Sequence, residues 1–150
     1  MTNENSSILK IMVNDHHRIE HLIDNVEKSL DEDFDVIEKT FDAFEWHLQK
    51  HIFAEEKAIF TDYEPEDVSS GYKMLPTLTK QHNDILNRLE IMKRSVQNGK
   101  TPEKVSEFKK VLMKHRSFEE IDVYPKLQET LSEGQKQKII EKIKAIIKRD

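Results

Sequence analysis

The sequence contains the stretch HIFAEEKAIF at residues 51–60 and a matching stretch HRSFEEIDVY at residues 115–124. Each copy has a His, two successive Glu that begin four residues later, and an aromatic residue at its end. Upstream of each copy stands another His followed three residues later by Ile, in DHHRI at 15–19 and in QHNDI at 81–85. Recurring His and Glu are typical of metal binding and not of a helix core, so the repeat predicts two half-sites around two metal ions.

The apolar residues around these stretches recur in alternating steps of three and four, which predicts long amphipathic helices. Each apolar stripe is interrupted by one His, and the second and fourth stripes also contain a Glu four residues after it. Four amphipathic helices with short connections predict an all-α fold, an antiparallel up-down four-helix bundle with a short extra C-terminal helix.

We expect a single domain over residues 1–150, with the bundle at about 6–127 and the extra helix at about 135–148. The stretch 61–71 is rich in turn-forming residues and is predicted to be a loop. The apolar stripe of the extra helix is predicted to pack on the bundle, with a dimer surface as the alternative.

The helix boundaries follow from capping residues. Ser6 or Ser7 is the predicted cap of the first helix, and Asp33 that of the second. Thr101-Pro102 is predicted to open the fourth helix as cap and first residue. Pro125 is predicted to end or bend that helix, because proline disfavours the helical conformation of the residue before it.

The composition narrows the class of protein. Charged residues make up 35% of the chain and there are only three Gly and four Pro, which favours surface-charged helices over strands. The net charge of −5 argues against a nucleic-acid partner. Cys is absent, so a metal would have nitrogen and oxygen ligands. No signal peptide or membrane-spanning apolar run is visible, and we expect a soluble cytoplasmic protein.

The placement of His and Glu within apolar stripes is the main physical argument for a metal site. A polar group buried without a partner costs roughly 1–3 kcal/mol, and a buried carboxylate must be paired or coordinated. A His and a Glu four residues apart lie on one helix face, so the His can bind one metal ion while the Glu reaches a second. The predicted metal ligands are His16, His51, Glu55, His82, His115 and Glu119.

Simpler interpretations exist for single members of this set. A lone core His bonded to a Glu is common, and one His-x-x-x-Glu is usually a solvent-facing ion pair. The ordered recurrence on all four predicted helices favours the metal site. His47 is left as either a metal ligand or a hydrogen-bond partner of one. The side chains predicted to face solvent are His17, Glu20, His21, Glu56 and Glu120.

The order His … His-x-x-x-Glu … His … His-x-x-x-Glu resembles that of the hemerythrin-like family, the HHE cation-binding domains, from about residue 8 to residue 127. The resemblance implies an up-down bundle around two iron ions bridged by two carboxylates and an oxo or hydroxo group. Imidazole and carboxylate also suit zinc or manganese. Ferritin-like di-iron bundles are disfavoured, because they use Glu-x-x-His and none of the four His has a Glu three residues before it.

The chain departs from the oxygen-carrying members of that family at two positions. Leu86 stands four residues after His82, where they have a second His, and Glu119 stands four residues after His115, where they have an Asp one residue later. The first departure removes a nitrogen ligand and leaves open positions on the irons. Reaction with oxygen, peroxide or nitric oxide is then favoured over stable oxygen carriage. The resemblance then favours two His per iron, His16 with His51 and His82 with His115, with Glu55 and Glu119 as the bridging carboxylates.

Three functions are compatible with the sequence. The first is a di-iron protein that binds or senses a small molecule (O₂, NO or peroxide) or iron itself. The second is a di-iron oxidase, a peroxidase or an enzyme that repairs iron centres. The third is an interaction module with a structural metal ion or none. A sensor would need a separate protein partner for its output, because no DNA-binding segment or enzymatic domain is visible.

Overall fold

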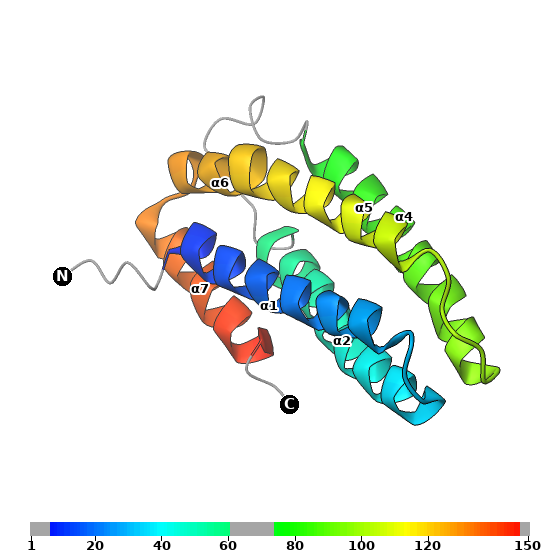
Figure 1. The fold of residues 1–150 in the computed structure, drawn as a ribbon. Helices are drawn as coiled ribbons and strands as arrows, with labels where there is room; N and C mark the ends of the chain where they lie inside the picture. Colours follow the sequence, from blue (N-terminus) through cyan, green and yellow to red (C-terminus); the bar gives the residue numbers. More distant parts are fainter. Residues whose placement is uncertain (1–6, 61–73, 148–150) are drawn as a thin grey trace.

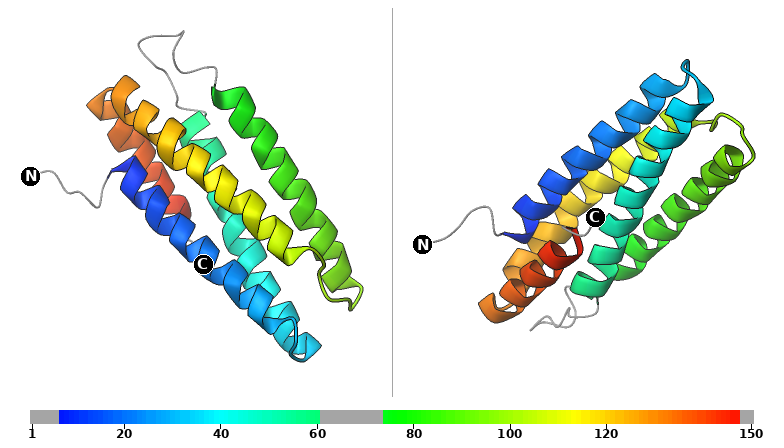
Figure 2. Two further views of the ribbon diagram at one scale, coloured as in Figure 1. Left: turned by 45° about the horizontal axis from the view of Figure 1, so that its top comes forward. Right: turned by 90° about the horizontal axis from the view of Figure 1, so that it is seen from below.

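The structure, a computed structural model, describes residues 7–60 and 74–147, and within these ranges it contains helices and no strand (Figure 1). The long helices are α1 (Ile8–Ser29), α2 (Phe34–Ala54), α4 (Met74–Gln97) and α5 (Val105–Phe118). Both α2 and α5 contact α1 and α4, so the four helices surround a common core (Figure 2). The predicted antiparallel bundle with an extra C-terminal helix is confirmed.

The C-terminal part of the chain covers one end of the bundle. The short helix α6 (Tyr124–Thr130) continues the direction of α5, and α7 (Glu133–Ile147) turns back to pack on α2 and α1 (Figure 1). The stripe of α7 is buried at Ile139, Ile140 and Ile143, which join residues of the bundle in one apolar cluster. The stripe therefore packs within the molecule. None of the described helices is long and apolar enough to cross a membrane.

Two of the four predicted helix boundaries agree with the structure. Ser7 caps α1, its hydroxyl accepting a hydrogen bond from Lys10 N at 3.1 Å, and Asp33 precedes α2. The predicted start at Thr101-Pro102 is wrong, because Lys104 has a left-handed φ of 61° and α5 begins after it at Val105.

Of the two predicted outcomes at Pro125, an end or a bend of the fourth helix, the end is wrong. The chain stays helical to Thr130, because Pro125 lies in the first turn of α6, where its missing N–H is tolerated. The helix geometry changes before the proline instead, in a π-helical segment at Glu119–Val123. The predicted loop at 61–71 lies outside the described residues.

The repeated Glu residues each begin a π-helical segment, one at Glu55–Phe60 and the other at Glu119–Val123. In a π-helix the hydrogen bond spans five residues, as that from Tyr124 N–H to the Glu119 carbonyl does. The wider turn places Tyr124 on the same interior side as Glu119, and both are fully buried. The sequence repeat is therefore also a repeat of helix geometry, of a kind that often occurs at functional sites.

The apolar core of the described residues is divided into two clusters. One contains Met12 and Leu78 together with residues of α6 and α7, and the other contains Leu48, Ile85 and Phe108. The repeated His and Glu lie between these clusters along each helix. Apolar side chains thus cover the polar layer from both ends of the bundle and keep bulk water away from it.

Candidate metal centre

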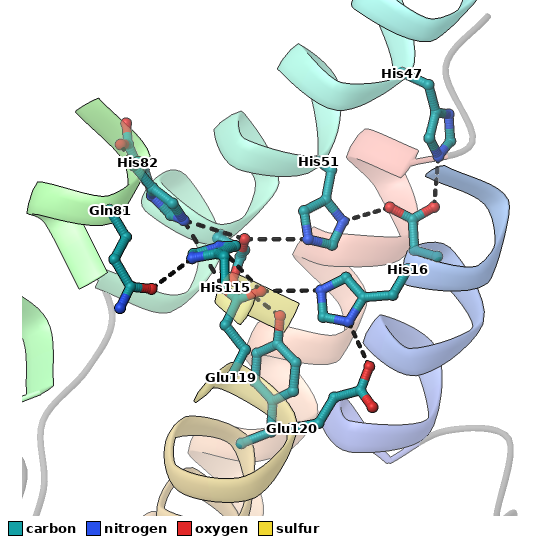
Figure 3. A network of polar contacts seen from close by, with 12 residues as sticks. His16, His47, His51, Gln81, His82, His115, Glu119 and Glu120 are labelled. Atoms are coloured by element: carbon teal, nitrogen blue, oxygen red, sulfur yellow. Dashed lines mark hydrogen bonds and ion pairs between the residues drawn. The ribbon is translucent and has the colours of Figure 1, made fainter. Parts of the chain in front are cut away.

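The structure brings all six predicted metal ligands together in this polar layer. Each long helix supplies one His, and the starts of the π-helical segments supply the two Glu. None of the six exposes more than 7% of its surface. Figure 3 shows the four His side chains and that of Glu119 converging from the different helices. Such burial of polar side chains is costly unless they satisfy one another or a cation.

The carboxylate of Glu119 lies at the middle of the group. Its Oε1 lies 2.9 Å from Nε2 of His16 and 3.3 Å from Nε2 of His115. Its Oε2 lies 3.8 Å from Nε2 of His82. A single carboxylate thus reaches imidazoles from α1, α4 and α5.

The carboxylate of Glu55 approaches the same centre from α2. Its Oε1 lies 3.1 Å from Nε2 of His51 and 3.4 Å from Nε2 of His82. Its Oε2 accepts a hydrogen bond from the Tyr124 hydroxyl at 2.9 Å. Tyr124 therefore holds the outer oxygen of this carboxylate and leaves the inner oxygen directed at the imidazoles.

Within the described ranges the donor atoms form two groups that are compact enough to hold a metal ion, with all atoms of a group within 4.8 Å of one another. The members are Glu55, His82, His115 and Glu119 in one group, and His16, His51 and Glu119 in the other. Glu119 belongs to both groups, as a bridging carboxylate would, whereas Glu55, the other predicted bridge, belongs to one of them. The pairing of the His residues is the one that the resemblance implied.

The residues fit a metal centre, because several buried atoms at the middle lack a hydrogen bond. Among the described residues, Nε2 of His51, Nε2 of His115, Oε1 of Glu55 and Oε2 of Glu119 make none. Each buried polar atom left this way costs about 1–3 kcal/mol. Cations placed between these atoms would satisfy all of them. Imidazole and carboxylate donors suit iron, zinc or manganese.

The outer ring nitrogens of the His residues are held by side-chain oxygens. The contacts of Nδ1 are to Glu120 at 2.7 Å for His16, to Asp15 at 2.5 Å for His51, to Glu56 at 3.4 Å for His82 and to Gln81 at 2.7 Å for His115. For His16, His51 and His115 the contact is a hydrogen bond, and an acceptor at Nδ1 keeps the proton there and leaves the Nε2 lone pair for a metal ion. All four imidazoles are thus turned with Nε2 toward the centre.

Sequence reasoning missed most of these partners. Asp15 and Gln81 were not singled out, and Glu120 was predicted to face solvent, whereas it is half-buried against His16. The sequence did contain a signal, because both copies of the repeat have a second Glu. In the structure, the second Glu of each copy contacts the upstream His of the other pair of helices. The prediction for Glu56 was correct in exposure but missed its contact with His82.

The remaining histidines lie outside the two groups of donor atoms. Nε2 of His47 contacts Oδ1 of Asp15 at 2.7 Å, and the other oxygen of Asp15 contacts His51. His47 is therefore a hydrogen-bond partner of Asp15. Asp15 lies between His47 and His51, so His47 is one contact further from the centre. His17 and His21 are exposed, as predicted.

The mutual charges of these groups shift their pKa values. Burial opposes the change, but Glu119 and Glu55 raise the pKa of His82 to about 10. Burial lowers the pKa of His51, but Glu55 and Asp15 outweigh it and raise this pKa well above its usual range. Burial acts upward on the pKa of Glu119, yet hydrogen bonds with Glu55, His115 and His16 and the charge of His115 hold it well below its usual range. Without a metal ion, the imidazoles and carboxylates thus favour each other's charged forms.

Metal loading is expected to release at least one proton per chain at pH 8, because ligating imidazoles must be neutral. Without metal, His82 is protonated at this pH because its pKa is raised to about 10, and the pKa of His51 is shifted in the same direction. The apparent affinity should thus rise with pH, by about tenfold per unit for each proton displaced. Calorimetric titration in buffers of different ionisation enthalpy measures the released protons. Binding heats that do not depend on the buffer would contradict this prediction.

The comparison with protein families agrees with this geometry. Residues 7–127 match the model of the family described as Hemerythrin HHE cation binding domain. The matched range includes the four long helices and all six predicted metal ligands. Neither a curated protein nor a solved structure matches the chain.

Proposed function

Since the chain belongs to the hemerythrin HHE cation binding domain family, we propose that its buried His and Glu side chains hold two iron ions and that this site binds or senses a small molecule such as O₂, NO or peroxide. The observation that carries the proposal is the arrangement of the donor atoms in two groups that share Glu119. A shared carboxylate suits two neighbouring cations better than one.

The two groups differ in a way that favours binding of a small molecule at one of them. The group that contains His16 and His51 has three donor residues, whereas the group that contains His82 and His115 has four. A metal ion in the three-donor group has more room for an external molecule. We therefore propose that the small molecule binds on the side of His16 and His51.

A small cavity lies on that side of the centre. It has a volume of about 40 Å³ and is bordered by His16, His51 and His115, with apolar side chains such as Ile19 and Leu112 around them. One water molecule needs roughly 10–15 Å³ measured in this way. The space in it suffices for a molecule of two or three atoms next to the metal position, which supports an O₂, NO or peroxide ligand.

The protein's own residues would bind the metal ions, orient their ligands and shield the site from water. Iron in this site would supply coordination of the small molecule and exchange of electrons with it. The imidazoles would hold the metal through Nε2, since Nδ1 of His16, His51 and His115 is hydrogen-bonded, and Tyr124 fixes the outer oxygen of Glu55. The apolar clusters exclude water, which strengthens the electrostatic interactions inside.

Elemental analysis and a visible–ultraviolet spectrum of protein loaded with iron in air would test the proposal. We expect two irons per chain and the near-ultraviolet absorption of an oxo-bridged pair. The loaded protein should also melt at a higher temperature than chelated protein, because a cation that binds only the folded state stabilises it. Absence of bound iron after loading would refute the proposal, and peroxide turnover well beyond one equivalent per site would favour a di-iron enzyme instead.

A further inference from the structure

Arg116 follows His115 on α5, and its guanidinium donates to two carboxylates. Nε donates to Oε2 of Glu120 at 2.9 Å, and Nη1 donates to Oε2 of Glu20 on α1. The same oxygen of Glu120 contacts Nδ1 of His16 at 2.7 Å. A continuous path of charge-assisted hydrogen bonds therefore runs from the surface of α1 through Arg116 to His16.

The other half of the repeat provides an internal comparison. The positions that correspond to the arginine and its partner on α1 hold Ile52 and Leu86. There the second Glu of the repeat, Glu56, is 41% exposed and lies 3.4 Å from Nδ1 of His82. The corresponding Glu120 is 21% exposed and lies 2.7 Å from its imidazole. The arginine thus accompanies a shorter and more buried contact between carboxylate and imidazole.

We propose that Arg116 is a positioning residue for the metal position of His16. It holds Glu120 against Nδ1 of His16 and so directs Nε2 of that ring at Glu119 and the metal ion. The inference rests on the proposed function, because it takes His16 as a metal ligand. Arginine suits this role because its planar group donates to two carboxylates in a fixed geometry, which a lysine cannot reproduce.

Lys109 offers a matched control on the same pair of helices. It joins α5 to α1 through Asp24 at 2.6 Å and Glu27 at 3.2 Å. Its side chain is 29% exposed, close to the 26% of Arg116. The variants Arg116→Gln and Lys109→Gln each remove one positively charged side chain between α5 and α1. Only the first variant removes a contact to Glu120.

The experiment uses cobalt(II) as the probe, because its affinity for nitrogen and oxygen donors is the next higher after that of iron(II) in the series of divalent metals. Release of cobalt to excess chelator is followed by absorption. We expect Arg116→Gln to release cobalt from one of the two positions about tenfold faster than wild type, in line with other partners of ligating His. Lys109→Gln should release it at the wild-type rate. In NMR spectra of the cobalt protein, the ring N–H of His16 should exchange with solvent faster in Arg116→Gln alone.

The possible outcomes separate the inference from the proposed function. Wild-type protein that binds no cobalt or iron refutes the metal centre and the inference with it. Wild-type protein that binds two ions, with equal release rates in Arg116→Gln and Lys109→Gln, refutes the inference alone. Glu20→Gln provides a second test if Arg116→Gln does not fold, since it removes the anchor on α1 and should also speed release. An unchanged rate in that variant would overturn the role of the path.

Discussion

Replacement of Glu119 by Gln is expected to abolish metal binding at both positions. Among the described residues, Glu119 is the carboxylate that belongs to both groups of donor atoms. A carboxamide carries no charge, and its NH₂ group cannot bind a metal ion. Removing a residue that only hydrogen-bonds to a metal ligand lowers metal affinity by about 10–100-fold. Loss of a ligand that both ions share should therefore lower the affinity by roughly 100-fold or more at each position.

The measurement is the metal content of each variant after loading and gel filtration. The shape of the side chain is nearly unchanged in Glu119→Gln, so the helical circular dichroism should match that of wild type. Glu107→Gln on the exposed side of α5 is the matched control and should keep the wild-type content. A Glu119→Gln protein that keeps two metal ions would show that the shared carboxylate has been misassigned.

The second large effect is expected from Asp15→Asn. The buried Asp15 accepts hydrogen bonds from both His47 and His51, which lie one helical turn apart on α2. Burial opposes the change, yet these two contacts hold the pKa of Asp15 far below its usual range. Asn can accept from one imidazole only and turns its amide N–H groups toward the other.

Two consequences should follow from this substitution. The metal-free protein should lose about 3 kcal/mol of unfolding free energy at pH 7, because a buried charged partner is removed. That loss corresponds to roughly 10 °C in melting temperature for a chain of this size. Metal affinity should fall by about 10–100-fold, because His51 loses the partner that orients it. Thermal unfolding and competitive metal titration measure the two effects.

The variant His47→Gln separates the two roles of Asp15. It removes one imidazole from Asp15 but leaves the contact with His51 in place. We therefore expect a lower melting temperature with nearly wild-type metal affinity. If His47→Gln and Asp15→Asn lost metal equally, His47 would have to act as a metal ligand itself.

Local periodicity was enough to predict the bundle and the residues that meet in it. Steps of three and four place His51 and Glu55 on one helix face, whatever lies opposite. The interruption of every apolar stripe by a His predicted which side chains would be buried. Both predictions depend only on the geometry of a single helix, which the residue spacing determines.

The partners of the imidazoles needed the tertiary structure. Asp15 stands next to His16 in the chain but contacts His51, and Glu120 stands next to Glu119 but contacts His16. Such pairs depend on how far one helix is rotated and shifted against its neighbour, and no local pattern encodes that.

The sequence by itself thus determined an all-α bundle with four His and two Glu in its seam, because burial follows helical periodicity. The tertiary structure alone decided the division of the donor atoms into two groups and the path through Arg116. These features arise from contacts between residues on different helices. Their energies depend on distance and orientation in space, which the order of residues along one helix does not specify.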